Sequence, residues 1–187
     1  MTNETLQTIK NRFSCRAFTG EMPTDEQLRL IAVAATQAPS ARNEQHWRIH
    51  LLKSPALMQE METAGMAVAA ADENPYIFNR VLSRGGKMFY NAPCMIVIAI
   101  EEGGFPYAEL DCGIVCQNIT LAAESLGMAS IICGMVGIPL KGEKGPELMK
   151  KIGIGDGWRY GIGVLLGFAG KRVPSHEPDP NKIIVVE

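Results

Sequence analysis

The chain has 187 residues, of which 47% are apolar and 20% charged, and its formal net charge is −2. This length suits one compact domain over residues 1–187 rather than two domains. The near-neutral charge gives no general attraction to nucleic acid or to an anionic membrane, so neither is expected as a partner. Residues 88–100 and 125–140 are the longest uncharged stretches, and both are shorter than the roughly 18 to 20 residues that span a bilayer. Because the N-terminus lacks the apolar segment of a signal peptide, we expect a cytoplasmic protein.

The cysteine and histidine contents argue against several kinds of site. The five cysteines lie in or beside apolar runs, which is typical of reduced, buried thiols. Cys112 and Cys116 would share a helix face, but no further ligand pair completes a metal site, so core packing is expected. The three histidines are not grouped for a metal or for a Ser-His-Asp triad. The glycine motifs of Rossmann and P-loop proteins are absent from the sequence.

The hydrophobic pattern predicts helices and strands in irregular alternation. In chain order they are helices 3–12 and 23–38, strand 49–52, helices 55–71 and 76–90, strand 94–100, helix 107–126, strand 129–133, helix 147–152, and strands 161–168 and 183–186. This order favours the α+β class over a doubly wound parallel sheet.

Local signals indicate where the helices begin and end and which of their side chains face the core. Thr24 and Gln27 predict a capping box at the second helix, which Pro39 ends. Gly127 ends helix 107–126, and this helix is apolar nearly all round, so it should be the central buried helix. Other side chains expected to face the core are Leu6, Ile9, Leu28, Ile31 and Val33.

Two polar motifs suggest a ligand site. The run Arg12-Phe13-Ser14-Cys15-Arg16 places two guanidinium groups and a hydroxyl within five residues. Such a set suits phosphate or an electron-rich heterocycle. The run from Pro39 to Trp47 concentrates Ser, Asn, Gln and Trp donors behind a proline. The two runs predict a protein that holds a cofactor rather than one that catalyses with its own side chains.

Together the motifs resemble the FMN-dependent nitroreductase family, in which R-x-S-x-R and P-S-x-x-N-x-Q-P-W hold the flavin. The similarity covers nearly the whole chain. It continues in Asn91-Ala92-Pro93 before a buried strand, and in the glycine-rich strand that ends at Phe168. The chain departs from the family pattern at two positions. His46 stands where the family usually has proline, and Cys133 stands where some members carry an acid.

The resemblance implies a mostly antiparallel sheet flanked by helices, and a homodimer that binds one FMN per subunit at its interface. The tail, residues 170–187, would reach the partner subunit, and its strand 183–186 would join the partner's sheet. The alternative is an edge strand on the chain's own sheet; the length of the tail favours the exchange.

The resemblance also implies site residues. Arg16 would lie at the N1/O2 side of the flavin, with Arg12 and Ser14 toward the phosphate and ribityl chain. Ser40 and Asn43 would contact the flavin from the partner chain. The full set of expected cofactor-binding residues is Arg12, Ser14, Arg16, Pro39, Ser40, Asn43, Gln45, Gly134, Lys171 and Arg172.

The activity that the resemblance implies is a ping-pong reduction. NADH or NADPH would give hydride to the flavin, and a nitroaromatic, a quinone or another small flat electron acceptor would then take it. Two other classes of function stay open. One is a different flavin reaction on the same fold, such as dehalogenation, flavin cleavage or azoline oxidation. The other is a non-enzymatic flavin-binding protein.

Overall fold

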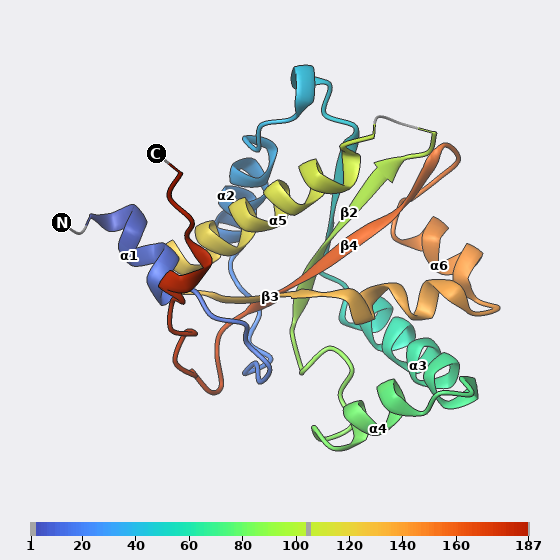
Figure 1. The fold of residues 1–187 in the computed structure, drawn as a ribbon. Helices are drawn as coiled ribbons and strands as arrows, with labels where there is room; N and C mark the ends of the chain where they lie inside the picture. Colours follow the sequence, from blue (N-terminus) through green and yellow to red (C-terminus); the bar gives the residue numbers. More distant parts are fainter. Residues whose placement is uncertain (1–2, 104–105, 187) are drawn as a thin grey trace.

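A four-stranded sheet forms the centre of the computed structural model, which describes residues 3–103 and 106–186 (Figure 1). The strand order is β1-β2-β4-β3, and every neighbouring pair is antiparallel. The strands are β1 (Trp47–Leu52), β2 (Cys94–Glu101), β3 (Ala129–Cys133) and β4 (Trp158–Gly167). The prediction of an α+β protein with a mostly antiparallel sheet flanked by helices is confirmed.

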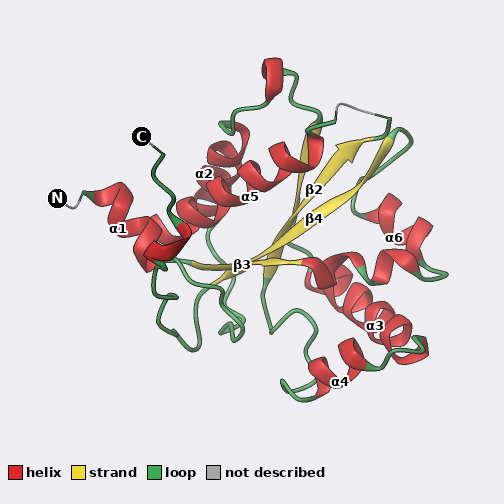
Figure 2. Ribbon diagram, viewed as in Figure 1, coloured by secondary structure: helices red, strands yellow, loops and turns green. Residues whose placement is uncertain are grey.

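Helices lie on both sides of this sheet (Figure 2). Helices α2 and α5 cover one face, whereas α3 and α6 lie toward the other, with α4 beside α3 and α1 against α5. Their bounds are α1 Glu4–Asn11, α2 Asp25–Thr36, α3 Pro55–Ala71, α4 Tyr76–Leu82, α5 Ala108–Ser125 and α6 Gly145–Lys151. Short 3-10 turns add η1 (Ala41–Asn43), η2 (Gly134–Gly137), η3 (Pro139–Lys141) and η4 (Pro180–Lys182).

Strand β2 is buried on both faces. Every residue from Cys94 to Ile100 is at most 1% exposed. Alternate side chains enter the two cores, as the period of a strand requires. Toward α2 and α5 point Cys94, Ile96, Ile98 and Ile100, and toward α3 and α6 point Met95, Val97 and Ala99. The continuous apolar run therefore has the burial that the sequence predicts for it.

The local signals are confirmed as well. The Gln27 amide donates to Thr24 Oγ1 at 3.2 Å, and the Thr24 amide donates to Gln27 Oε1 at 3.0 Å, which completes the capping box. Gly127 follows α5 with a left-handed φ of +72°. All five cysteines are free and buried.

Several element bounds differ from the predicted ones. Helix α4 ends at Leu82 rather than at residue 90, because Gly85 and Gly86 take φ values of +87° and +71° that no helix continues. Strands β1 and β4 begin earlier than predicted, at Trp47 and Trp158, where cross-strand pairing extends them.

The predicted inward orientation of three apolar residues is wrong within one subunit. Leu6, Ile9 and Val33 are 50%, 47% and 46% exposed. On α5, Leu110 is 63% exposed, so this helix is buried only on the side that faces the sheet and α2. Sequence periodicity identifies an apolar face but not what covers it.

Residues 183–186 form no strand, and their side chains are 74–89% exposed. The alternative in which they form an edge strand on the chain's own sheet is therefore wrong. The chain ends on the same side of the view as α1 (Figure 1), and residues 183–186 form no bridge with any strand that the structure describes. The four apolar side chains of residues 183–186 therefore do not pack into a hydrophobic core of this chain.

Candidate functional site

The run of residues 12–16 lies along the sheet edge formed by β3. Ser14 and Ser130 form a parallel bridge, and the Cys15 amide donates to the Ser130 carbonyl at 3.0 Å. Phe13 and Cys15 are buried, at 4% and 0% exposure. Because side chains alternate along an extended backbone, the even-numbered residues of the run lie on the opposite, open side.

Arg12 carries a polar atom that this subunit leaves unsatisfied. Its Nε is buried and has no hydrogen-bond partner within residues 3–103 and 106–186. An unpaired buried donor costs about 1–3 kcal/mol, so this atom is open to an acceptor from outside the chain, either water or a bound ligand. A guanidinium fork matches phosphate oxygens well.

Arg16 lies near the end of β3. Burial raises the pKa of the Cys133 thiol, and the positive charge of Arg16 partly opposes that shift. The thiol therefore stays protonated at neutral pH and carries no negative charge there. Gly134 follows it and is exposed, and a Cβ placed there would meet no heavy atom within 4 Å. The backbone beside Arg16 thus faces open space.

The start of the tail joins the same region. Arg172 forms an ion pair with Glu124, donates to the Asn11 carbonyl at 3.1 Å, and places its Cζ 4.7 Å from the centre of the Phe13 ring. The neighbouring Lys171 is exposed. These contacts hold a third guanidinium beside the two of the N-terminal run.

Backbone pairing fixes the position of this tail segment. Phe18 and Ala169 form an antiparallel bridge, and the Gly170 amide donates to the Ala17 carbonyl at 2.8 Å. The N-terminal run, the end of β3 and the start of the tail therefore converge, although they are far apart in the sequence. We call this region, with Arg12, Ser14, Arg16, Gly134 and Arg172, the basic cradle.

The second motif lies elsewhere in the subunit. Residues 39–45 form a loop around η1 at the end of the molecule above α2 and α5, away from α1 and β3 (Figure 1). Within this loop, which we call the η1 loop, the Gln45 amide donates to Ser40 Oγ at 3.0 Å and Gln45 Nε2 donates to Asn43 Oδ1 at 2.8 Å. Pro39 and Ser40 border an apolar hollow that Leu110 also lines. One subunit therefore brings the cradle residues together but not the η1-loop residues.

His46 follows this loop and contacts two carboxylates. Its Nδ1 lies 2.7 Å from Glu101 Oε2, and its Nε2 lies 2.6 Å from Glu44 Oε2. The hydrogen bond to Glu101, followed by that to Glu44, raises the pKa of His46. Sequence reasoning missed this cluster, because Glu101 is 55 positions away and resembles a solvated turn residue.

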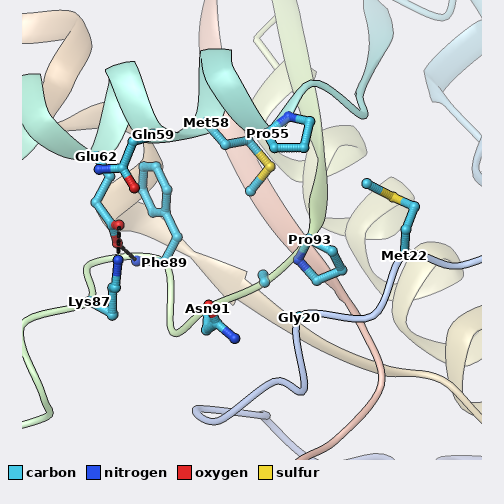
Figure 3. A pocket seen from close by; sticks show the side chains of 11 residues that line it. Gly20, Met22, Pro55, Met58, Gln59, Glu62, Lys87, Phe89, Asn91 and Pro93 are labelled. Atoms are coloured by element: carbon cyan, nitrogen blue, oxygen red, sulfur yellow. Dashed lines mark hydrogen bonds and ion pairs between the residues drawn. The ribbon is translucent and has the colours of Figure 1, made fainter.

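A pocket of about 300 Å³ lies between α3 and the segment before β2 (Figure 3). Glu62 Oε1 accepts a hydrogen bond from the Phe89 amide at 2.9 Å, and Glu62 Oε2 lies 3.6 Å from Lys87 Nζ. The turn that follows holds Tyr90 and Asn91 at left-handed φ values of 54° and 63°. Glu62 is therefore satisfied by the protein and holds a strained turn. No predicted cofactor-binding residue lines this pocket.

Two further kinds of feature are absent from the part of the chain that the structure describes. No helix there has the length and hydrophobicity that crossing a bilayer requires. No group of three or more His, Cys, Asp or Glu side chains there is arranged to hold a metal ion.

Comparisons with known proteins give a consistent result. A model of the nitroreductase family matches residues 9–168. The chain is 49% identical to a nitroreductase with bound FMN from Desulfitobacterium hafniense, with a TM-score of 0.96 and full coverage of both chains. It is 26% identical to a nitroreductase with bound FMN from Bacteroides fragilis, with a TM-score of 0.85 and again full coverage of both. It is also 28% identical to an Archaeoglobus fulgidus protein provisionally named NADH dehydrogenase/NAD(P)H nitroreductase, over 94% of this chain and 91% of that protein.

Proposed function

We propose that this chain, which belongs to the nitroreductase family, is an FMN-dependent oxidoreductase. It takes hydride from NADH or NADPH and reduces nitroaromatics, quinones or similar flat acceptors. The observation that carries the proposal is the buried, unpartnered Nε of Arg12 in the basic cradle. The bound FMN of the D. hafniense protein and the name of the A. fulgidus protein support the choice of cofactor and co-substrate.

The donor set of the basic cradle fits FMN, which has one phosphate and a flat ring system. Arg12 binds the phosphate and Ser14 the ribityl chain. Lys171 adds positive charge at the phosphate end, where the charge of Arg172 is partly offset by its ion pair with Glu124. Arg16 binds the N1/O2 side of the ring, where a fixed guanidinium stabilises negative charge.

Gly134 leaves the space beside the ring open, because a side chain there would project into it. When bound, FMN supplies the redox chemistry of the protein, since its ring accepts and donates hydride. The chain's own residues bind and orient the reactants. No side-chain acid or base is assigned, because water supplies protons to acceptors of this kind.

The site is completed by a second subunit in a homodimer. The η1 loop of the partner subunit supplies Pro39, Ser40, Asn43 and Gln45, which are too far from the cradle to act within their own chain. Two features support this arrangement. Leu110, beside the η1 loop, is 63% exposed, and the apolar tail residues 183–186 are 74–89% exposed. We infer that the tail, residues 170–187 of the single domain, reaches the partner and adds a strand to its sheet.

NAD(P)H and the acceptor occupy the same open face of the cradle in turn, which makes the kinetics ping-pong. The five free, buried cysteines support a reducing, cytoplasmic location.

The proposal is tested on the purified protein. We expect a yellow protein that releases FMN rather than FAD on denaturation, and that oxidises NADH or NADPH in the presence of menadione or a nitrofuran. Arg12→Ala should weaken FMN binding, whereas Lys150→Ala, which removes an exposed charge on α6, should not. Release of FAD, or a colourless protein that does not take up added FMN, would refute the proposal. FMN binding without NAD(P)H oxidation would favour the non-enzymatic alternative.

A further inference from the structure

The contacts of His46 require a particular protonation state. A carboxylate only accepts hydrogen bonds, and each ring nitrogen of His46 lies within 2.7 Å of one. Neutral imidazole has one N–H and can donate to only one of them. Both bonds therefore form only when the ring is the imidazolium, with an N–H on each nitrogen.

These contacts join the η1 loop to the sheet. Glu44 belongs to the loop, whereas Glu101 is the last residue of β2. The Glu101 amide also donates to the His46 carbonyl at 3.2 Å. The imidazolium thus attaches a loop residue to a rigid strand end.

The η1 loop needs such an attachment, because its backbone is strained. Arg42, Asn43 and Gln45 have φ values of 55°, 58° and 52°, in the left-handed region that residues with a Cβ rarely adopt. Strained backbone of this kind persists only where surrounding contacts hold it, and it is concentrated at binding sites. Two of the three residues, Asn43 and Gln45, are expected to bind the flavin.

We propose that protonated His46 is a positioning residue that holds the η1 loop in its flavin-binding conformation, so that FMN affinity falls when His46 loses its proton. This inference rests on the proposed function, because it assumes that the loop contributes to the FMN site. The proline of other family members would fix the same position covalently and without a pH dependence.

The direction of the pH effect follows from the charges around the ring. Glu101 and Glu44 both raise the pKa of His46 in the folded chain. The contribution is therefore fully present below the ordinary histidine pKa of about 6.5 and is lost as pH rises through the folded value. The charged residues on the elements around His46 include Glu44, Glu101, Glu102, Arg42, which lies 3.9 Å from Glu44, and Arg48, which lies over the Trp158 ring. They also include Arg159 on β4, which forms an ion pair with Glu109.

The first test, made without flavin, concerns the contacts of His46 with Glu44 and Glu101, which we call the His46 clamp. The sequence has three histidines, so NMR titration of the apo-protein can follow each imidazole, with His46→Gln and His176→Gln assigning the signals. We expect His46 to titrate above the ordinary histidine range, and Glu101→Gln to lower its pKa. An ordinary or lowered pKa of His46 would refute the claim that the protonated ring bridges the two carboxylates.

The coupling to cofactor is tested by FMN titration at about pH 6.5 and about pH 9.5, on either side of the transition measured by NMR. Beyond any change shared by all variants, the dissociation constant of the wild type should rise about two- to fivefold at the higher pH, the range that a partly exposed ion pair allows. Lys150→Ala, which removes an exposed charge on α6, should behave like the wild type. His46→Gln should show none of this extra rise, and if it does not fold, Glu101→Gln provides the same test.

The possible failures can be told apart. FMN binding with the same pH dependence in the wild type and in His46→Gln would refute the inference but leave the proposed function intact. A wild-type protein that binds no FMN at either pH would refute the proposed function, and the coupling with it.

Discussion

A mixed dimer of two variants tests whether each flavin site is built from two chains. Arg16 belongs to the basic cradle and Asn43 to the η1 loop, and that loop lies away from α1 and β3 (Figure 1). Arg16→Ala removes an exposed guanidinium. Asn43→Ala removes the acceptor of the Gln45 side chain and places alanine at a φ of 58°, which costs about 1–2 kcal/mol. Each variant alone should therefore bind little FMN.

The magnitude follows from the two-fold symmetry. In a mixed dimer one site carries both substitutions and the other carries neither. Equal amounts of the two chains give about half mixed dimers, each with one good site of two, so roughly a quarter of the wild-type flavin should return. Mixed dimers isolated with two different affinity tags should be about half occupied.

The assay is co-refolding of the two variants, with bound FMN measured by absorbance and mixed dimers counted by native mass spectrometry. Arg12→Ala mixed with Arg16→Ala is the matched control, because both residues lie in one cradle and every site of a mixed dimer keeps one substitution. This control should recover no flavin. Mixed dimers of Arg16→Ala and Asn43→Ala that also recover none would show that both residues serve the same chain's site, and the interface placement of FMN would then be wrong.

Three further predictions concern kinetics, redox potential and stability. Because NAD(P)H and acceptor use one open face in turn, double-reciprocal plots at several acceptor concentrations should be parallel; intersecting lines would mean that both bind together. Arg16→Gln, which keeps a hydrogen-bond donor but removes the charge, should lower the midpoint potential of bound FMN in a dye-coupled reduction, since the reduced flavin loses its positive neighbour, and an unchanged potential would remove Arg16 from the N1/O2 role. Glu62→Ala should lower the free energy of unfolding by about 2 kcal/mol in urea, because the Phe89 amide loses a charged acceptor. Glu62→Gln keeps an acceptor and should lose less, so equal losses would contradict this account.

Local signals in the sequence predict the parts of the fold that depend on neighbouring residues. Thr24 and Gln27 form the expected capping box because both partners lie within one helical turn. The run from Cys94 to Ile100 predicts a strand buried on both faces because all of its residues are apolar. The fold class follows from such elements and their order.

Features that depend on distant contacts were not predictable in the same way. The pairing of His46 with Glu101 and the attachment of the turn after Phe89 to Glu62 need the folded sheet to bring the partners together. Leu6 and Leu110 are exposed in this chain although their apolar character predicts burial. The expected cofactor-binding residues came from motif order, and the structure separates them into a cradle and a loop.

The long-range contacts of the basic cradle determine when it can form during synthesis. Its N-terminal run is held by Ser130 and, through Phe18, by Ala169, so its contacts join residues more than a hundred positions apart. Such long-range contacts form late in folding. During synthesis the run leaves the ribosome long before Ser130 and Ala169, and it stays without these partners until they have followed. If the cradle binds flavin as proposed, flavin cannot guide the folding steps that precede these contacts.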